Sequence, residues 1–259
     1  MSGADWPAPA PGAARLPSMV TAQAGLELRT LARNGEQVLL TLIIPVLLLV
    51  VFSSEALISV GPGRRIGFIA PGILALAVLS TSFTSLAIGT AFERRYGVLK
   101  RLGATPLSRS GLLAAKAVTV LAVEAGQVVL IVVVSVLLGW RPVVTAQSVL
   151  SAAAILIVGS VALCGLAMLM AGTLRAEATL AAANLVYLVL LGIGGVVFPL
   201  TKFPASVRPA LRLLPSGAMS DGLRAVLRYG AGWPARDLLV LAAWAVVGLV
   251  IAARTFRWE

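Results

Sequence analysis

Long apolar runs separated by short polar connections dominate the pattern of this chain. Two of these runs, residues 66–92 and 142–174, contain no charged side chain. A bilayer crossing takes about 20 apolar residues, each adding about 1.5 Å, so runs of this length exceed the needs of a soluble core helix. The pattern predicts six membrane-spanning helices, at about residues 38–60, 66–92, 112–140, 148–174, 178–199 and 238–254.

Three further segments are too polar to cross a membrane alone. Residues 1–17 are rich in Ala, Pro and Gly and predict a disordered cytoplasmic tail before a transmembrane domain of residues 18–259. Residues 20–37 mix apolar and charged positions at helical spacing, which fits an amphipathic helix on the membrane surface or an ordinary solvated helix. Residues 203–230 show a similar pattern between prolines and predict short re-entrant amphipathic helices at the outer interface. The expected fold class is therefore an all-α membrane protein.

Composition supports this fold class and narrows the chemistry. Of 259 residues, 59% are hydrophobic and 12% are charged, whereas an ordinary soluble domain has about 45–50% and about 25%. The chain has no histidine and a single cysteine, Cys164, so a metalloenzyme or a Ser-His hydrolase is nearly excluded. The net charge of +11 on so apolar a chain is better explained by anionic lipid headgroups and orientation signals than by nucleic acid.

The most informative segment is the basic connection between the second and third predicted spans. Its pattern predicts a short helix at about residues 93–106, with Tyr96, Leu99 and Leu102 on one face. Pro106 forbids continuation of this helix. A compact exposed helix held between two spans is suited to transmit a rigid-body motion, although a basic loop that only sets the topology fits the same pattern.

Residues 93–107, Glu-Arg-Arg-Tyr-Gly-Val-Leu-Lys-Arg-Leu-Gly-Ala-Thr-Pro-Leu, resemble the signature of ABC-2 type permeases, especially the drug and antibiotic exporters. That signature is approximately E-R-E/R-x-G-T/V-L-x-x-L-x-A-T/S-P. Lys116 matches a lysine that is frequent in the family. Residues 27–33 with Pro45 are similar to the first amphipathic helix and first span of the family, and residues 198–215 resemble part of its closing third.

The resemblance implies a transmembrane dimer whose exposed helices dock on ATP-binding subunits. It assigns the coupling role to Glu93, Arg94, Arg95, Tyr96, Gly97, Leu99, Lys100, Arg101, Leu102, Thr105 and Pro106. Arg95, Lys100 and Arg101 stand where acidic residues are common in the family, which affects the choice of partner more than the fold. The sequence contains no G-x-x-x-x-G-K-[ST] motif, so ATP and Mg²⁺ are expected on a separate ATPase subunit, while this chain is expected to bind no cofactor or metal and to be no enzyme.

The resemblance also implies export of an amphipathic substrate, such as a drug, an antibiotic or a lipid, with a role in efflux or drug resistance. The expected partners are ABC ATPase subunits, a second permease that makes a homodimer or a heterodimer, and membrane lipid, but no nucleic acid. Six crossings place both termini on one side of the bacterial plasma membrane. The basic connection between the second and third spans favours the cytoplasm for that side.

Three polar residues inside the predicted spans are candidates for the substrate path: Glu124, Gln127 and Asn184. Glu124 lies about 18 Å along the third span and hence near the midplane, where an ionisable group is costly. Gln127 follows on the same helix face, whereas Asn184 fits better with a hydrogen bond between helices. A structural ion pair or a neutral hydrogen-bonded acid explains Glu124 as well. The alternative function is an ion- or proton-coupled secondary transporter that uses Glu124, and a lipid-metabolising enzyme is disfavoured because the acidic residues are scattered.

Overall fold

The computed structural model describes residues 12, 14–54 and 64–255, and these contain helices and no strand. Helix α1 (Leu16–Arg33) ends before Asn34, and α2 (Gly35–Ser54) follows directly, with Pro45 inside it. Most of the predicted tail and the far end of the first predicted span lie outside the described residues. The prediction of a disordered tail therefore stays a prediction.

Among the described residues, five helical segments are long and apolar enough to cross a membrane. The first runs without a break from Ile66 to Arg95 through α3 (Ile66–Val78), the π-helical η1 (Leu79–Ser85) and α4 (Leu86–Arg95). The others are α6 (Arg109–Leu137), α7 (Ala146–Thr173), α8 (Ala176–Ile193) and α11 (Ala235–Thr255). A suitable helix thus occupies each of the second to sixth predicted spans. The described apolar part of α2, Thr41–Ser54, is shorter, so a sixth crossing stays a prediction.

Small residues allow α7 and α11 to pack closely. A Cβ built on Gly165 of α7 would lie 2.9 Å from the backbone nitrogen of Leu249, and a Cβ built on Gly248 of α11 would lie 3.1 Å from the carbonyl carbon of Gly165. Such close backbones are typical of membrane helices, because lipid provides no hydrophobic driving force and association depends on packing. The contact fixes the last span against the centre of the bundle.

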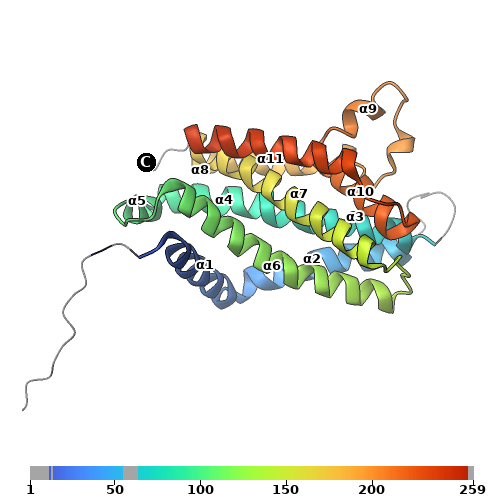
Figure 1. Cartoon of the computed structure of the whole chain (residues 1–259), viewed down its shortest axis with the longest axis horizontal. Helices are drawn as coiled ribbons and strands as arrows, with labels where there is room; N and C mark the ends of the chain where they lie inside the picture. Colours follow the sequence, from blue (N-terminus) through green and yellow to red (C-terminus); the bar gives the residue numbers. More distant parts are fainter. Residues whose placement is uncertain (1–11, 13, 55–63, 256–259) are drawn as a thin grey trace, which may run out of the picture.

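The bundle has two distinct ends (Figure 1). The short helix α5 (Val98–Gly103), helix α1 and the C-terminal end of α11 lie at one end, and α9 (Arg208–Leu211) and α10 (Pro215–Tyr229) lie at the other. The α5 end therefore lies on the side of the bundle from which both α1 and the last turns of α11 emerge.

Helix α10 is largely buried in the protein, and its predicted position at the outer interface stays a prediction. Most of its residues are buried, and it packs against α3, α7 and α11. Glycines permit this position: a Cβ on Gly217 would lie 2.2 Å from the carbonyl oxygen of Leu211, and a Cβ on Gly222 would lie 3.1 Å from Cδ1 of Ile155. The apolar periodicity indicates the helix correctly, but the small residues let it enter the bundle.

Arg224 fastens α10 to the start of α3 and to the segment after α8. Its side chain is 5% exposed. The guanidinium donates to the carbonyl oxygens of Phe68, Gly195 and Val196 at 3.2, 2.5 and 2.7 Å and lies 3.7 Å from the centre of the Phe68 ring. Burial lowers the pKa of Arg224 to about 9, so the group stays charged at neutral pH. Carbonyl dipoles and the ring face thus take the place of water around a buried cation.

Candidate functional site

The coupling segment, defined here as residues 93–106, contains two short helical parts rather than the single helix that the sequence predicts. Helix α4 ends at Arg95, Gly97 has a φ of +72°, and the six residues of α5 begin at Val98. This left-handed conformation strains residues with a side chain, which is why glycine commonly ends a helix in this way. The prediction of one continuous helix is therefore wrong, and Gly97 is the physical reason.

The break at Gly97 also separates Tyr96 from the apolar face expected for it. Leu99 is fully buried and Leu102 is half-buried, whereas Tyr96 is 66% exposed. Lys100 and Arg101 are exposed on α5. One leucine therefore anchors α5 to the bundle, while two cations are exposed on α5 and an aromatic side chain is exposed in the turn before it.

The turn after α5 leads directly into the third span. Thr105 and Pro106 are exposed there, and the Thr105 hydroxyl donates to the carbonyl oxygen of Leu102 at 2.6 Å. Ser108 then caps α6, because its hydroxyl oxygen accepts a hydrogen bond from the backbone nitrogen of Gly111 at 3.1 Å. The exposed turn is thus held at both ends by local hydrogen bonds.

Two arginines join the end of α4 to the connection between α7 and α8. Arg94 donates to the carbonyl oxygen of Leu174, and Arg95 pairs with Glu177 in the first turn of α8. The partners are 80 and 82 residues apart in the sequence. Because Arg95 and Glu177 are exposed, their pair contributes about 0–1 kcal/mol to stability. Its main effect is to position the coupling segment against a second loop.

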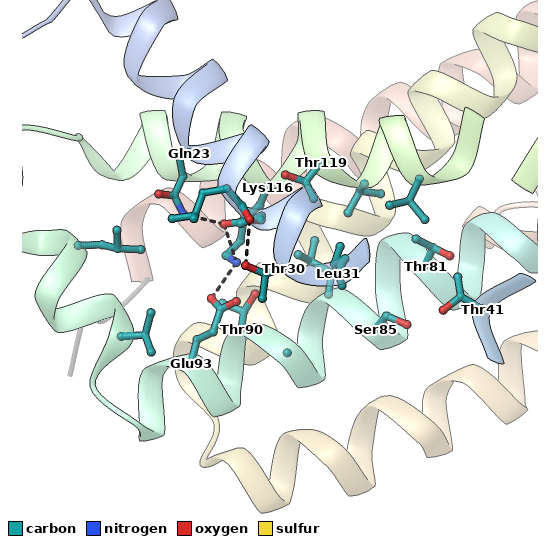
Figure 2. Close-up of a pocket in the computed structure, with 18 residues that line it drawn as sticks. Gln23, Thr30, Leu31, Thr41, Thr81, Ser85, Thr90, Glu93, Lys116 and Thr119 are labelled. Carbon is teal, nitrogen blue, oxygen red and sulfur yellow. Dashed lines mark hydrogen bonds and ion pairs between the residues drawn. The ribbon is translucent and has the colours of Figure 1, made fainter. Parts of the chain in front are cut away.

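Lys116 of α6 joins three helices in a buried ion-pair cluster. Its ammonium lies 2.8 Å from Oε2 of Glu93 in α4 and 3.2 Å from Oε1 of Glu27 in α1. The Gln23 amide donates to the same Glu27 oxygen at 3.0 Å. Figure 2 shows Lys116 and Glu93 pointing toward each other. Since Lys116 is 3% exposed, its charge depends on these carboxylates, and the coupling segment is thereby connected to α1 and α6.

A cavity of about 410 Å³ lies beside this cluster. Its wall is formed by residues of α1, α2, η1, α4, α5 and α6, and Figure 2 draws all of them. The wall is mainly apolar, and hydroxyl groups are spread along it from Thr41 and Thr81 to Thr90. The site therefore combines apolar space with a charged cluster.

Glu124 forms a closed polar contact near the middle of α6. The hydroxyls of Ser82 and Ser160 donate to its two carboxylate oxygens, and the side chain is 4% exposed. Ser82 belongs to η1, and π-helical turns of this kind are frequent at functional sites. Glu124 thus connects η1, α6 and α7 and does not line the cavity.

Gln127 extends this polar contact along the same helix face, as the sequence predicts. Its Oε1 accepts from the Thr81 hydroxyl at 3.0 Å, and its Nε2 donates to the carbonyl oxygen of Thr41 at 2.9 Å. Asn184 does not join it. Its side chain is exposed on α8 and donates to the carbonyl oxygen of Leu180 in the same helix at 2.9 Å. The structure therefore does not bring Asn184 together with Glu124 and Gln127, and its place on a substrate path stays a prediction.

Two residues of the site were not among the sequence candidates for it. Glu27 supplies a counterion for Lys116, and the need of an intramembrane lysine for a carboxylate was the available signal. Thr90 is 1% exposed, and its hydroxyl has no hydrogen-bond partner among the described residues. A lone threonine in an apolar run gives no sequence signal of this kind.

Comparison with known proteins identifies a family for the chain. Residues 64–254 match the family model described as ABC-2 family transporter protein. The match covers well over half of the chain and contains the coupling segment, Lys116 and Glu124, while α1 and α2 lie outside it. No curated protein matches the chain. The chain therefore belongs to the ABC-2 transporter family.

Proposed function

We propose that this ABC-2 permease exports an amphipathic substrate, driven by ATP that separate ATPase subunits hydrolyse. Members of the family normally work with ATP-binding subunits. In this proposal the coupling segment docks on the ATPase, the α5 end of the bundle faces the cytoplasm, and two permease chains, identical or different, form the membrane part. The proposal also places the chain in the subgroup of drug and antibiotic exporters.

The exposed side chains of the coupling segment support a docking role. Helix α5 lies at the extreme end of the bundle (Figure 1), and Tyr96, Lys100 and Arg101 project from it or from the turn before it. Exposed aromatic and arginine side chains are the residue types most enriched among strong interface contacts. Because Leu99 is fully buried beneath them, a force applied to these side chains acts on a rigid element.

The observation that carries the proposal is the ion-pair cluster of Lys116 with Glu93 and Glu27. Glu93 lies in α4, Lys116 in α6 and Glu27 in α1. A displacement of the coupling segment therefore pulls on all three helices through charges that are costly to separate in a buried place. The Arg95 and Glu177 pair extends the same connection to α8.

The surroundings of Glu124 favour this function over a proton-coupled secondary transporter. A carboxylate that carries protons across a membrane needs access to water in at least one state. Glu124 is 4% exposed, and serine hydroxyls occupy both of its oxygens. Its bonds to η1 and α7 suit a structural contact between helices.

The test is a matched pair of tyrosine substitutions in the reconstituted transporter. Tyr96 of the coupling segment is 66% exposed, and Tyr229, at the opposite end of the bundle, is 70% exposed. We expect Tyr96→Ala to lower substrate-stimulated ATP hydrolysis about tenfold, as loss of a central interface aromatic does. Tyr229→Ala should leave it unchanged. Equal coupling in both variants, with both inserted normally in the membrane, would reject the proposed docking site.

A further inference from the structure

We propose that the cavity beside Lys116 binds an amphiphilic cation, a positively charged molecule with N–H groups on an apolar body. The inference rests on the proposed function only in taking this ligand as cargo, because binding itself needs neither ATP nor a partner. The cavity lies within one chain, between α1, α2, η1, α4, α5 and α6.

The charges around the cavity leave an unfilled place for a cation. The lining residues carry two carboxylates, Glu27 and Glu93, and one ammonium, Lys116, and the remaining lining residues are uncharged. Lys116 contacts Oε1 of Glu27 and Oε2 of Glu93, while the second oxygen of each carboxylate has no hydrogen-bond or ion-pair partner among the described residues. A second ammonium would neutralise the cluster, whereas an anion would add to its negative charge.

Thr90 adds an acceptor at the same place. It lies one helical turn before Glu93 on α4, and Figure 2 shows the two side chains beside each other at the cavity wall. Its hydroxyl is buried and unpartnered among the described residues, and such a group gains a hydrogen bond when a ligand donor arrives. The unpartnered hydroxyl and the free carboxylate oxygens thus point to a ligand that carries N–H groups.

The size and wall of the cavity fit an apolar body attached to that charge. Its volume of about 410 Å³ falls within the range of about 300–1,000 Å³ for small-molecule sites. Leu86, Val120 and Val123 supply apolar wall, and a Cβ built on Gly89 would meet no atom within 4 Å. A side chain added at Gly89 would therefore extend into open space of the cavity.

A pair of glycine substitutions tests the site sterically. Full-length chain in phosphatidylcholine nanodiscs would be titrated with the fluorescent cation rhodamine 6G, followed by fluorescence anisotropy. Gly126 of α6 also has no atom within 4 Å of its Cβ position and does not line the cavity, so Gly126→Phe is the control for Gly89→Phe. We expect saturable binding that Gly89→Phe weakens about tenfold or more and Gly126→Phe leaves unchanged. Equal effects of the two variants would overturn the proposal.

A second pair of variants tests the charge. Glu93→Gln removes one carboxylate of the cluster, and Glu177→Gln removes an exposed carboxylate outside the cavity. Loss of a charge-assisted hydrogen bond should weaken rhodamine 6G binding about tenfold in Glu93→Gln, with wild-type binding in Glu177→Gln. Absence of saturable binding in the wild-type chain, or equally tight binding of the anion sulforhodamine B, would overturn the proposal.

Two further comparisons show whether the ligand comes from the membrane or from solution, and distinguish failure of this site from failure of the proposed function. Nanodiscs that contain phosphatidylethanolamine weaken rhodamine 6G binding if a membrane aminolipid is the natural occupant, and leave it unchanged if the ligand comes from solution; either result supports an ammonium site. All binding is measured without the ATPase. If rhodamine 6G binds as expected but Tyr96→Ala does not lower ATP hydrolysis, the proposed function is rejected and the binding site stands. If Tyr96→Ala lowers ATP hydrolysis but rhodamine 6G does not bind, the binding site is rejected and the proposed function stands.

Discussion

The ion-pair cluster at Lys116 allows a quantitative prediction from a single substitution. Lys116→Met keeps a long flexible side chain of similar length but removes the ammonium that contacts Glu93 at 2.8 Å and Glu27 at 3.2 Å. Two carboxylates then face each other beside an apolar cavity without their shared counterion. The substitution should therefore destabilise the folded state because two carboxylates lose their counterion, and not because packing is lost.

The expected loss follows from the burial of the three groups. Removing one partner of a buried ion pair costs about 3–5 kcal/mol. Glu27 is 16% exposed and Glu93 is 34% exposed, so both can gain some hydration, and we expect the lower end, about 3 kcal/mol of unfolding free energy. Adding Glu27→Gln and Glu93→Gln to Lys116→Met should restore most of this loss, because replacement of a whole buried cluster is often about neutral.

The free energy of unfolding can be measured by SDS titration of the purified chain in mixed micelles, followed by circular dichroism. Lys202→Met is the control, since Lys202 is exposed at the opposite end of the protein, and it should change stability by no more than about 0.5 kcal/mol. If Lys116→Met has the same free energy of unfolding as this control, the charges do not hold α1, α4 and α6 together. The same conclusion follows if the triple variant is as unstable as Lys116→Met alone.

Three further substitutions test other parts of the structure. Arg224→Leu should lower the unfolding free energy by about 3–5 kcal/mol in the same titration, because three carbonyl oxygens lose their hydrogen-bond donor. A smaller loss for Arg224→Leu than for Arg224→Lys would contradict the role of the guanidinium. Gly248→Leu should lower the unfolding free energy by about 3 kcal/mol or more, because the side chain forces α11 away from α7. Gly192→Leu should be tolerated, since no atom lies within 4 Å of its Cβ position, and equal stability of the two variants would refute the close packing. Glu124→Gln should retain ATP-driven transport within about twofold, since an amide still bonds both serines; loss of transport in ATP-loaded vesicles would favour the secondary transporter.

The spans could be predicted from the sequence because lipid exposure requires long apolar helices whatever their partners are. Five of them appear where hydropathy places them. Helix α10 shows the limit of the same signal: its periodicity predicts a helix, but Gly217 and Gly222 determine that it is buried. The depth of a helix depends on shape complementarity with its neighbours, which periodicity does not encode.

The composition of the candidate site was only partly predictable. Lys116 could be singled out by resemblance, but its partner Glu27 is 89 residues away in the sequence, and only the tertiary fold brings them together. The break after α4 at Gly97 follows a known rule for helix termini and could have been predicted from the sequence. Asn184 is a polar residue in a span for which the sequence suggests a bond to another helix, but its side chain donates to a carbonyl oxygen of its own helix.

The π-helical turn η1 determines where the long segment from α3 to α4 can bend. Backbone hydrogen bonds are irregular in such turns, and sharp bends in helices concentrate there. On one side of η1, Arg224 of α10 donates to the carbonyl oxygen of Phe68 in α3; on the other side, α4 carries Glu93 and the coupling segment. The π-helical turn thus divides this long segment into two parts, one attached to α10 and the other continuous with the coupling segment.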